Sequence, residues 1–130
     1  MRLDHIAYRV SNRKKTAEFI KKTFGYTEGT EFNVKFDDDS SAKCVVLVPP
    51  ERTRDATGGR MAHVERPWII PTFDKTEYHM APEIFISQGT PDSVVGKWVK
   101  KRGGGGGIHH MAYLVTDIAQ SVRAWPDTRL

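Results

Sequence analysis

Residues 4–10 of the chain read DHIAYRV, and residues 109–115 read HHMAYLV. The two heptapeptides agree at His, Ala, Tyr and Val, and their third position is apolar in both, Ile in one and Met in the other. Each predicts a β-strand, because polar and apolar side chains alternate along it and β-favouring residues are frequent. A strand written twice, about a hundred residues apart, predicts two copies of one structural unit.

The first copy begins an expected β-α-β-β-β order. After the strand at residues 3–10, Ser11 or Asn12 can cap a helix, and Gly25 is a natural helix end. The apolar positions of this helix fall at helical spacing and are expected to face the core: Ala17, Phe19, Ile20 and Phe24. Further strands are expected at residues 26–37, 42–48 and 83–87, with a turn at residues 37–41, which read DDDSS. Residues 51–80 predict a long irregular segment, which in a compact domain is usually functional or mobile.

The second copy follows a helix and a glycine-rich link. Residues 91–102 predict a helix with Pro91 in its first turn and one apolar face, made of Val94, Val95, Trp98 and Val99. Residues 103–107 are all glycine and predict a flexible break before a strand at residues 108–116. Asp117 then caps a short helix that Pro126 ends. The expected fold class is α+β, with a βαβββ module at residues 1–90, a linker helix and glycine-rich link at 91–107, and the first strand and helix of a second, truncated module at 108–130.

The composition fits one globular domain, since 38% of the 130 residues are hydrophobic and 28% are charged. The single cysteine, Cys44, lies in the apolar run KCVVLV, so we expect it in the core of a protein from a reducing, cytoplasmic compartment. No apolar run approaches the roughly 20 residues of a membrane span, and the start has no signal-peptide pattern. The net charge of +4 is scattered, which fits solvated surfaces or a mild attraction for an anionic substrate. The expected partner is therefore a small-molecule substrate, and neither a nucleic acid nor a membrane.

Two histidines occupy equivalent places in the repeated strands. Because side chains alternate faces along a strand, His5 shares a face with Ala7 and Arg9, and His110 shares one with Ala112 and Leu114. If the two modules pair about a local two-fold axis, both imidazoles can meet at one divalent metal. An isolated strand histidine is more often an ordinary core or surface residue. We expect that ordinary role for His63 and His79 in the irregular segment, and we expect His109 on the opposite face of its strand.

The chain resembles the vicinal-oxygen-chelate (glyoxalase/bleomycin resistance/dioxygenase) superfamily in DHIAYRV, in the helix end TFGY, and in DSVVGKWVKKRGGGGGIHHMAYLVTDI. The nearest likeness within it is to the methylmalonyl-CoA epimerases. The resemblance implies two paired βαβββ modules that cup a divalent metal (Co, Mn, Ni, Zn or Fe). By position, it implies His5, Glu83 and His110 as metal ligands. Glu83 also fits an exposed charge at a strand start.

The chain departs from the superfamily pattern at two places. The fourth ligand of the family falls near the end of the second module, which the sequence does not reach, and no carboxylate stands near residues 44–45, where the epimerases carry a proton-transfer base. No catalytic residue is therefore assigned. The resemblance implies a metal-dependent enzyme, or a fragment of one, that acts on a small carboxylate or acyl-CoA, most closely an epimerase that works through a metal-stabilised enolate. An Fe(II) dioxygenase resembling the 4-hydroxyphenylpyruvate dioxygenases and a non-catalytic small-molecule-binding module are the alternatives. An incomplete second module leaves an open sheet edge, so we expect a homodimer.

Overall fold

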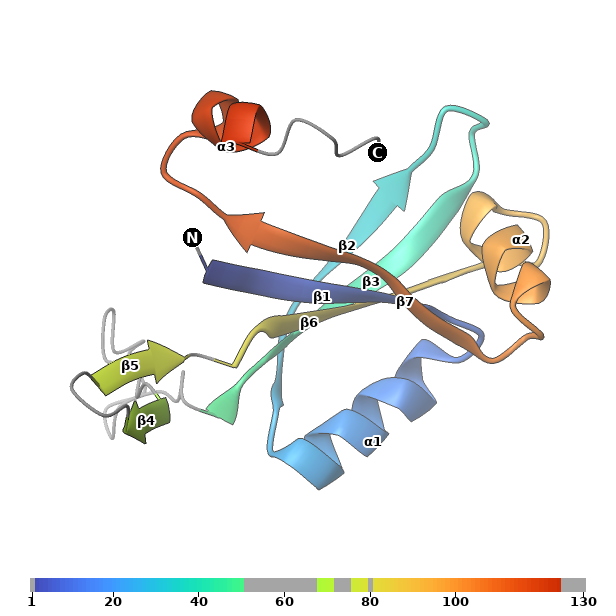
Figure 1. Ribbon diagram of the computed structural model, residues 1–130. Coiled ribbons are helices and arrows are strands. Elements are labelled where there is room, and N and C mark those ends of the chain that lie inside the picture. Colours follow the sequence, from blue (N-terminus) through green and yellow to red (C-terminus); the bar gives the residue numbers. More distant parts are fainter. Residues whose placement is uncertain (1, 51–67, 72–75, 80, 125–130) are drawn as a thin grey trace.

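The computed structural model describes residues 2–50, 68–71, 76–79 and 81–124 (Figure 1). The elements follow in the order β1 (Arg2–Val10), α1 (Arg13–Phe24), β2 (Thr27–Lys35), β3 (Ser41–Val48), β4 (Trp68–Pro71), β5 (Thr76–His79), β6 (Glu83–Gly89), α2 (Val94–Lys101), β7 (Gly106–Leu114) and α3 (Ile118–Ala124). Of the irregular segment expected at residues 51–80, residues 51–67, with His63, lie outside the described part, whereas β4 and β5 pair as a separate hairpin.

Five of these strands form one mixed sheet in the order β2-β3-β6-β1-β7. Strand β1 runs parallel to β6 and antiparallel to β7, so the two copies of the repeated heptapeptide lie side by side. Strands β1, β2, β3 and β6 together with α1 make the expected βαβββ module, and β7 begins the second copy. The predicted α+β fold class is confirmed.

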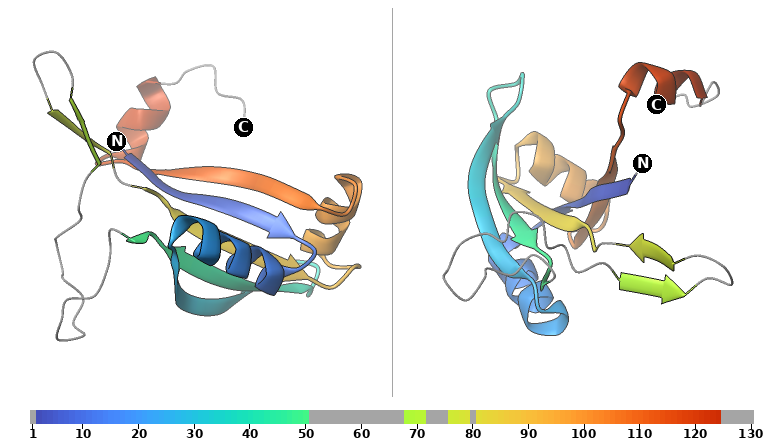
Figure 2. Two further views of the ribbon diagram at one scale, coloured as in Figure 1. Left: turned by 90° about the horizontal axis from the view of Figure 1, so that it is seen from below. Right: turned by 90° about the vertical axis from the view of Figure 1, so that its left-hand side faces the viewer.

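The sheet has two different faces. One face packs under α1 and forms the larger core, with Val10, Ala17, Ile20, Val45, Leu47, Ile84 and Ile86 buried in it. On the other face, α2 covers Ala42 and Cys44 with its buried side chains Val95 and Val99. Figure 2 shows the strong curvature of the sheet and α2 standing at one end of it. The part of this second face that α2 leaves uncovered is where the candidate site lies.

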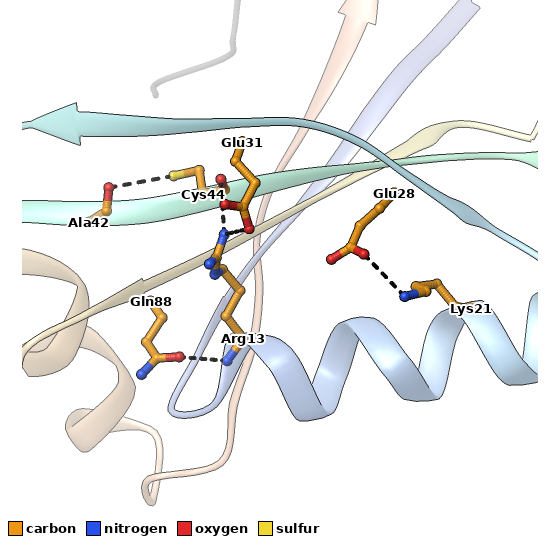
Figure 3. A network of polar contacts seen from close by, with 7 residues as sticks. All are labelled: Arg13, Lys21, Glu28, Glu31, Ala42, Cys44 and Gln88. Atoms are coloured by element: carbon orange, nitrogen blue, oxygen red, sulfur yellow. Dashed lines mark hydrogen bonds and ion pairs between the residues drawn. The ribbon is translucent and has the colours of Figure 1, made fainter.

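Helix α1 is fixed to the sheet at its first residue. Asn12 caps the helix by accepting a hydrogen bond from the backbone N–H of Lys15. The backbone N–H of Arg13 donates to the side chain of Gln88 at 2.6 Å, and its guanidinium donates to the carbonyl of Cys44 and pairs with Glu31 at 2.7 Å (Figure 3). These contacts join the helix start to β2, β3 and β6.

The expected apolar stripe of α1 is only half right. Ala17 and Ile20 are buried, but Phe19 and Phe24 are 61% and 57% exposed. Their rings form a T-shaped pair with centroids 6.2 Å apart, and neither ring belongs to the buried core of the sheet. The helical spacing was correct, but the sheet beneath α1 is covered by the two smaller side chains, which leaves the aromatic residues in solvent.

Two boundaries around the glycine-rich link differ from those expected. Helix α2 starts at Val94 with Ser93 as its cap, whose hydroxyl accepts a hydrogen bond from Gly96, so Pro91 precedes the first turn. Strand β7 starts at Gly106 and not at Ile108, because Gly106 and Gly107 pair with Val10 and Arg9. A glycine run predicts flexibility, and the last two glycines instead belong to the sheet.

Helix α3 follows β7 and projects from its end (Figure 1). Asp117 caps it as expected, since its carboxylate accepts a hydrogen bond from the N–H of Gln120. None of its residues is buried. Among the helices that the structure describes, none is long and apolar enough to cross a membrane.

Candidate functional site

A cavity of about 300 Å³ lies on the sheet face that α2 leaves open. Strands β1, β2, β3, β6 and β7 all contribute to its walls, and α2 closes one end. Its lining residues are His5, Ala7, Tyr8, Arg9, Phe32, Val34, Phe36, Ala42, Cys44, Phe85, Ile86, Ser87, Val95, His109 and His110. The walls are mostly aromatic and apolar, with one arginine and three histidines. The volume matches the lower end of small-molecule sites in proteins.

Strand register explains why these side chains gather. Residues that pair across neighbouring strands point to the same face. His5 lies beside Glu83 of β6 and Ala112 of β7, and the next row places Ala7 between Phe85 and His110.

A third row of paired residues follows along the strands on the same face. It places Arg9 between Ser87 and Gly107, and Ser87 in turn lies beside Cys44 of β3. The site is thus a grid of three rows, and its centre is the small side chain of Ala7.

The structure brings the two repeat-equivalent histidines together. The ring centroids of His5 and His110 are 5.5 Å apart, with the rings nearly perpendicular. Two imidazoles that share a metal through bonds of about 2.1 Å hold their centroids roughly 4.6–5.6 Å apart, for ligand angles of about 90–120°. The observed spacing therefore fits a shared divalent metal.

Each of these histidines has its Nδ1 engaged within the protein. His5 Nδ1 lies 3.0 Å from the carboxylate of Asp4, and His110 Nδ1 lies 2.8 Å from Nδ1 of His109. A carboxylate partner on Nδ1 leaves the lone pair on Nε2, which is the arrangement of most metal-bound histidines. The Nε2 lone pair of His110 is likewise left for a metal in the tautomer in which Nδ1 of His110 donates its hydrogen to His109.

The prediction that His109 faces away from His110 is wrong. Ala7 pairs with His110 but Tyr8 pairs with Ile108, so β7 carries one extra residue at this point. Such a β-bulge breaks the strict alternation of faces. His109 consequently lines the cavity and contacts Trp98 of α2, with the ring centroids 5.4 Å apart.

Glu83 lies on the same face as the two histidines and directly beside His5 in register. It is half-buried at the start of β6. Within the described residues, however, no three side chains of His, Cys, Asp or Glu converge as a metal cluster. The structure thus brings His5 and His110 together and places Glu83 beside His5 in register, on the neighbouring strand β6. His79 ends β5 in the separate hairpin.

Burial and positive charge shape the electrostatics of the cavity. Burial lowers the pKa of Arg9, and burial followed by the charges of His5 and Arg9 lowers the pKa of His110. The pKa of His109 is lowered as well, first by burial. The imidazoles of His109 and His110 are therefore neutral at pH 7, and the neutral form of His110 is the one that binds metals.

Cys44 lies in the core, as expected, and also forms part of the cavity floor. Burial raises the pKa of its thiol, so it remains protonated at neutral pH. The prediction that it packs as a small hydrophobic side chain fits this environment.

Sequence reasoning assigned no role to Asp4, Arg9 or Phe85. The ring of Phe85 stacks on His5 with centroids 4.1 Å apart and 7° between the planes. The alternation of faces along the strand puts Arg9 on the same face as His5, and this pattern is enough to predict that Arg9 enters the same site. The strict alternation expected for this strand does not predict the register shift beside Asp4, whose carboxylate contacts His5.

The first strand of the βαβββ module, β1, pairs with β7, which repeats its sequence, and a cavity lies at the seam between these two strands. This arrangement defines an α+β protein built on repeated βαβββ modules. The family model of the Glyoxalase/Bleomycin resistance protein/Dioxygenase superfamily matches residues 4–130. The chain belongs to this superfamily.

Solved structures show the same fold at low sequence identity. A methylmalonyl-CoA epimerase from Mycobacterium tuberculosis matches with a TM-score of 0.56 at 20% identity, over 95% of this chain and 63% of that one. A variant epimerase from Streptomyces coelicolor, in complex with 2-nitronate-propionyl-CoA, matches at 0.54 and 21%, over 98% and 71%. A variant 4-hydroxymandelate synthase from Streptomyces coelicolor matches at 0.62 and 19%, over 97% of this chain and 29% of that one. No curated protein sequence matches the chain.

Proposed function

We propose that this chain is a divalent-metal-dependent enzyme of the superfamily, acting on a small carboxylate or acyl-CoA. The observation that carries the proposal is the convergence of His5 and His110 from the paired strands β1 and β7, at a spacing that suits one metal. Glu83, beside His5 in register, is the proposed third ligand. Two imidazoles and a carboxylate suit several first-row metals, including Fe, Co, Ni, Zn and Mn.

The proposed chemistry is that of an epimerase. A bound divalent metal would polarise a substrate oxygen and so acidify the neighbouring carbon. The chain's own residues would orient the ligands: Asp4 holds the ring of His5, and Phe85 stacks against it. The walls of the cavity would exclude water from the apolar part of the substrate.

The metal content of the purified chain tests the site. The protein is made without a metal-binding tag, reconstituted with each candidate metal, dialysed and measured by mass spectrometry. We expect near-stoichiometric metal in the wild type and its loss in His5→Ala and in His110→Ala. His79→Ala, which lies in the separate β4–β5 hairpin, is the matched control and should retain it. Metal that is indifferent to both cavity histidines would contradict the proposal.

Solvent-deuterium exchange tests the reaction. Methylmalonyl-CoA is incubated with the metal-loaded chain in D₂O, and incorporation at the carbon between the two carbonyl groups is followed by NMR. We expect exchange with the wild type and none with His5→Ala. Oxygen uptake with an aryl-pyruvate, without such exchange, would instead assign the chain to the dioxygenase chemistry of the superfamily.

A binding module without catalysis is the second candidate. One observation favours it: among the described residues that line the cavity, none is a carboxylate that could serve as the proton-transfer base. A ligand that binds equally well in the presence of a chelator, with no exchange or oxygen uptake, would support this candidate.

A further inference from the structure

The guanidinium of Arg9 is the only fixed positive charge among the described residues that line the cavity. It is half-buried, and it lies 5.9 Å from the ring centroid of Phe36 and 5.8 Å from that of Trp98. Among the residues that the structure describes, no carboxylate forms an ion pair with it and no acceptor takes a hydrogen bond from it. A charge in such a place normally has a counter-ion, because burial of an unpaired charge is costly.

The neighbours of Arg9 leave its guanidinium accessible from the cavity. Gly107, which pairs with Arg9 on one side, has no side chain, and Ser87 on the other side donates its hydroxyl hydrogen to the carbonyl of Tyr8. The two aromatic rings support the cation on their faces, a contact that adds attraction but consumes none of its N–H donors. The fork of an arginine matches a carboxylate in two parallel hydrogen bonds.

The rest of the cavity fits an apolar body. Phe32, Val34 and Phe85 line it, and the rings of Phe32 and Phe85 form a T-shaped pair with centroids 6.1 Å apart. Arg9 lies four residues from His5 on one strand, a separation of about 13 Å along β1. A ligand anchored at Arg9 can thus extend over Ala7 toward the histidine pair.

We propose that Arg9 is the specificity-determining anion site of this cavity, and that it binds the carboxylate of a small acid whose aromatic or apolar body lies against Phe32 and Phe85. This deepens the proposed function by naming the acid's anchor. It rests on that function only for the statement that the bound acid is a substrate, since Arg9 acts without a metal.

Binding of matched acid and amide pairs to the chelator-treated chain tests the proposal. The probes are phenylacetate and 3-phenylpropanoate against phenylacetamide and 3-phenylpropanamide, titrated by NMR in EDTA. We expect the acids to bind in the low-millimolar range for ligands of about ten non-hydrogen atoms. The amides should bind about tenfold more weakly or worse, since a charge-assisted pair is lost.

Variants assign the preference to Arg9. Arg9→Gln should abolish the difference between acid and amide, and Arg9→Lys should keep only part of it, because the fork is lost. Arg102→Gln is the matched control: Arg102 also lies over the ring of Trp98, at 4.1 Å, but it is exposed and does not line the cavity. Backbone amide spectra of each variant confirm that the fold is retained.

The outcomes separate this inference from the proposed function. Equal binding of acid and amide, no binding of either acid, or a preference that survives Arg9→Gln would overturn the role of Arg9. Acids that bind only after metal is added, and not to His5→Ala, would overturn it too while supporting the metal site. An Arg9-dependent preference in a chain that never retains metal would sustain the anion site and refute the metal-dependent function.

Discussion

Replacement of Gly106 by alanine should separate β7 from β1 and thereby disturb the seam that carries the site. Gly106 has a φ of +85°, a conformation that costs an L-residue about 1–2 kcal/mol. A Cβ at this position would also overlap the backbone carbonyl oxygen of Arg9 and lie 2.8 Å from Cα of Val10. Because these are backbone atoms, the strand itself must shift, and such overpacking costs about 1–3 kcal/mol. The expected loss in free energy of unfolding is therefore about 2–5 kcal/mol, a large part of a typical total of roughly 5–15 kcal/mol.

Urea unfolding followed by circular dichroism measures this loss, with Gly105→Ala as the matched control. Gly105 is the preceding residue of the same glycine run, its φ is not positive, and a Cβ there would meet no atom within 4 Å. We expect Gly105→Ala to change the free energy of unfolding by less than about 0.5 kcal/mol. Equal stabilities for the two variants would refute the reasoning that β7 begins at Gly106 in close contact with β1.

Three further predictions concern the seam, the cavity floor and the exposed end of the chain. Asp4→Asn should weaken metal binding about 10–100-fold without unfolding the protein, because it removes the carboxylate that holds His5; a zinc competition titration measures this, and unchanged affinity would contradict it. Cys44 should react with iodoacetamide more slowly than a free thiol, with its onset at higher pH, because burial raises its pKa and so reduces the thiolate at any given pH. In urea, Cys44 should react with iodoacetamide as fast as a free thiol. A folded protein whose Cys44 already reacts that fast would contradict the prediction. The exposed apolar residues of β7 and α3 should support the expected homodimer, so Ile118→Glu should shift the chain toward monomer in analytical ultracentrifugation. Phe19→Glu on α1, which is also exposed and apolar, should not. A wild-type chain that is monomeric at micromolar concentration would contradict the dimer.

The fold class was predictable because its determinants are local and repeated. The alternation in residues 3–10 and 108–116 sets the strands, and Asn12, Gly25 and Asp117 mark helix ends by hydrogen bonds to nearby backbone groups. The boundary at Gly106 was not predictable in this way, since its glycine is required by a contact with a strand about a hundred residues earlier in the chain. The exposure of Phe19 likewise depends on what lies beneath α1 and not on the helix itself.

The candidate site was predictable as far as strand alternation holds. That alternation placed Arg9 on the face of His5, and the repeat predicted that His110 could meet His5 if the two modules pair. The structure brings all three to one cavity. The alternation failed for His109 because the bulge in β7 shifts the register by one residue. The metal-ligand role of His5, Glu83 and His110 remains a prediction.

The two register shifts at the seam follow the repeat itself. One leaves Asp4 as the extra residue of β1, between the pairs of Leu3 and His5, and the other leaves His109 as the extra residue of β7. Asp4 and His109 occupy the same position of the repeated heptapeptide, and each contacts Nδ1 of the histidine that follows it. The repeated heptapeptide thus carries, just before each histidine, a residue that contacts the Nδ1 atom of that histidine. The two partners differ in charge, because a carboxylate accepts only, whereas a neutral imidazole donates or accepts according to its tautomer. Asp4 therefore offers His5 an acceptor only, whereas His109 offers His110 a donor or an acceptor.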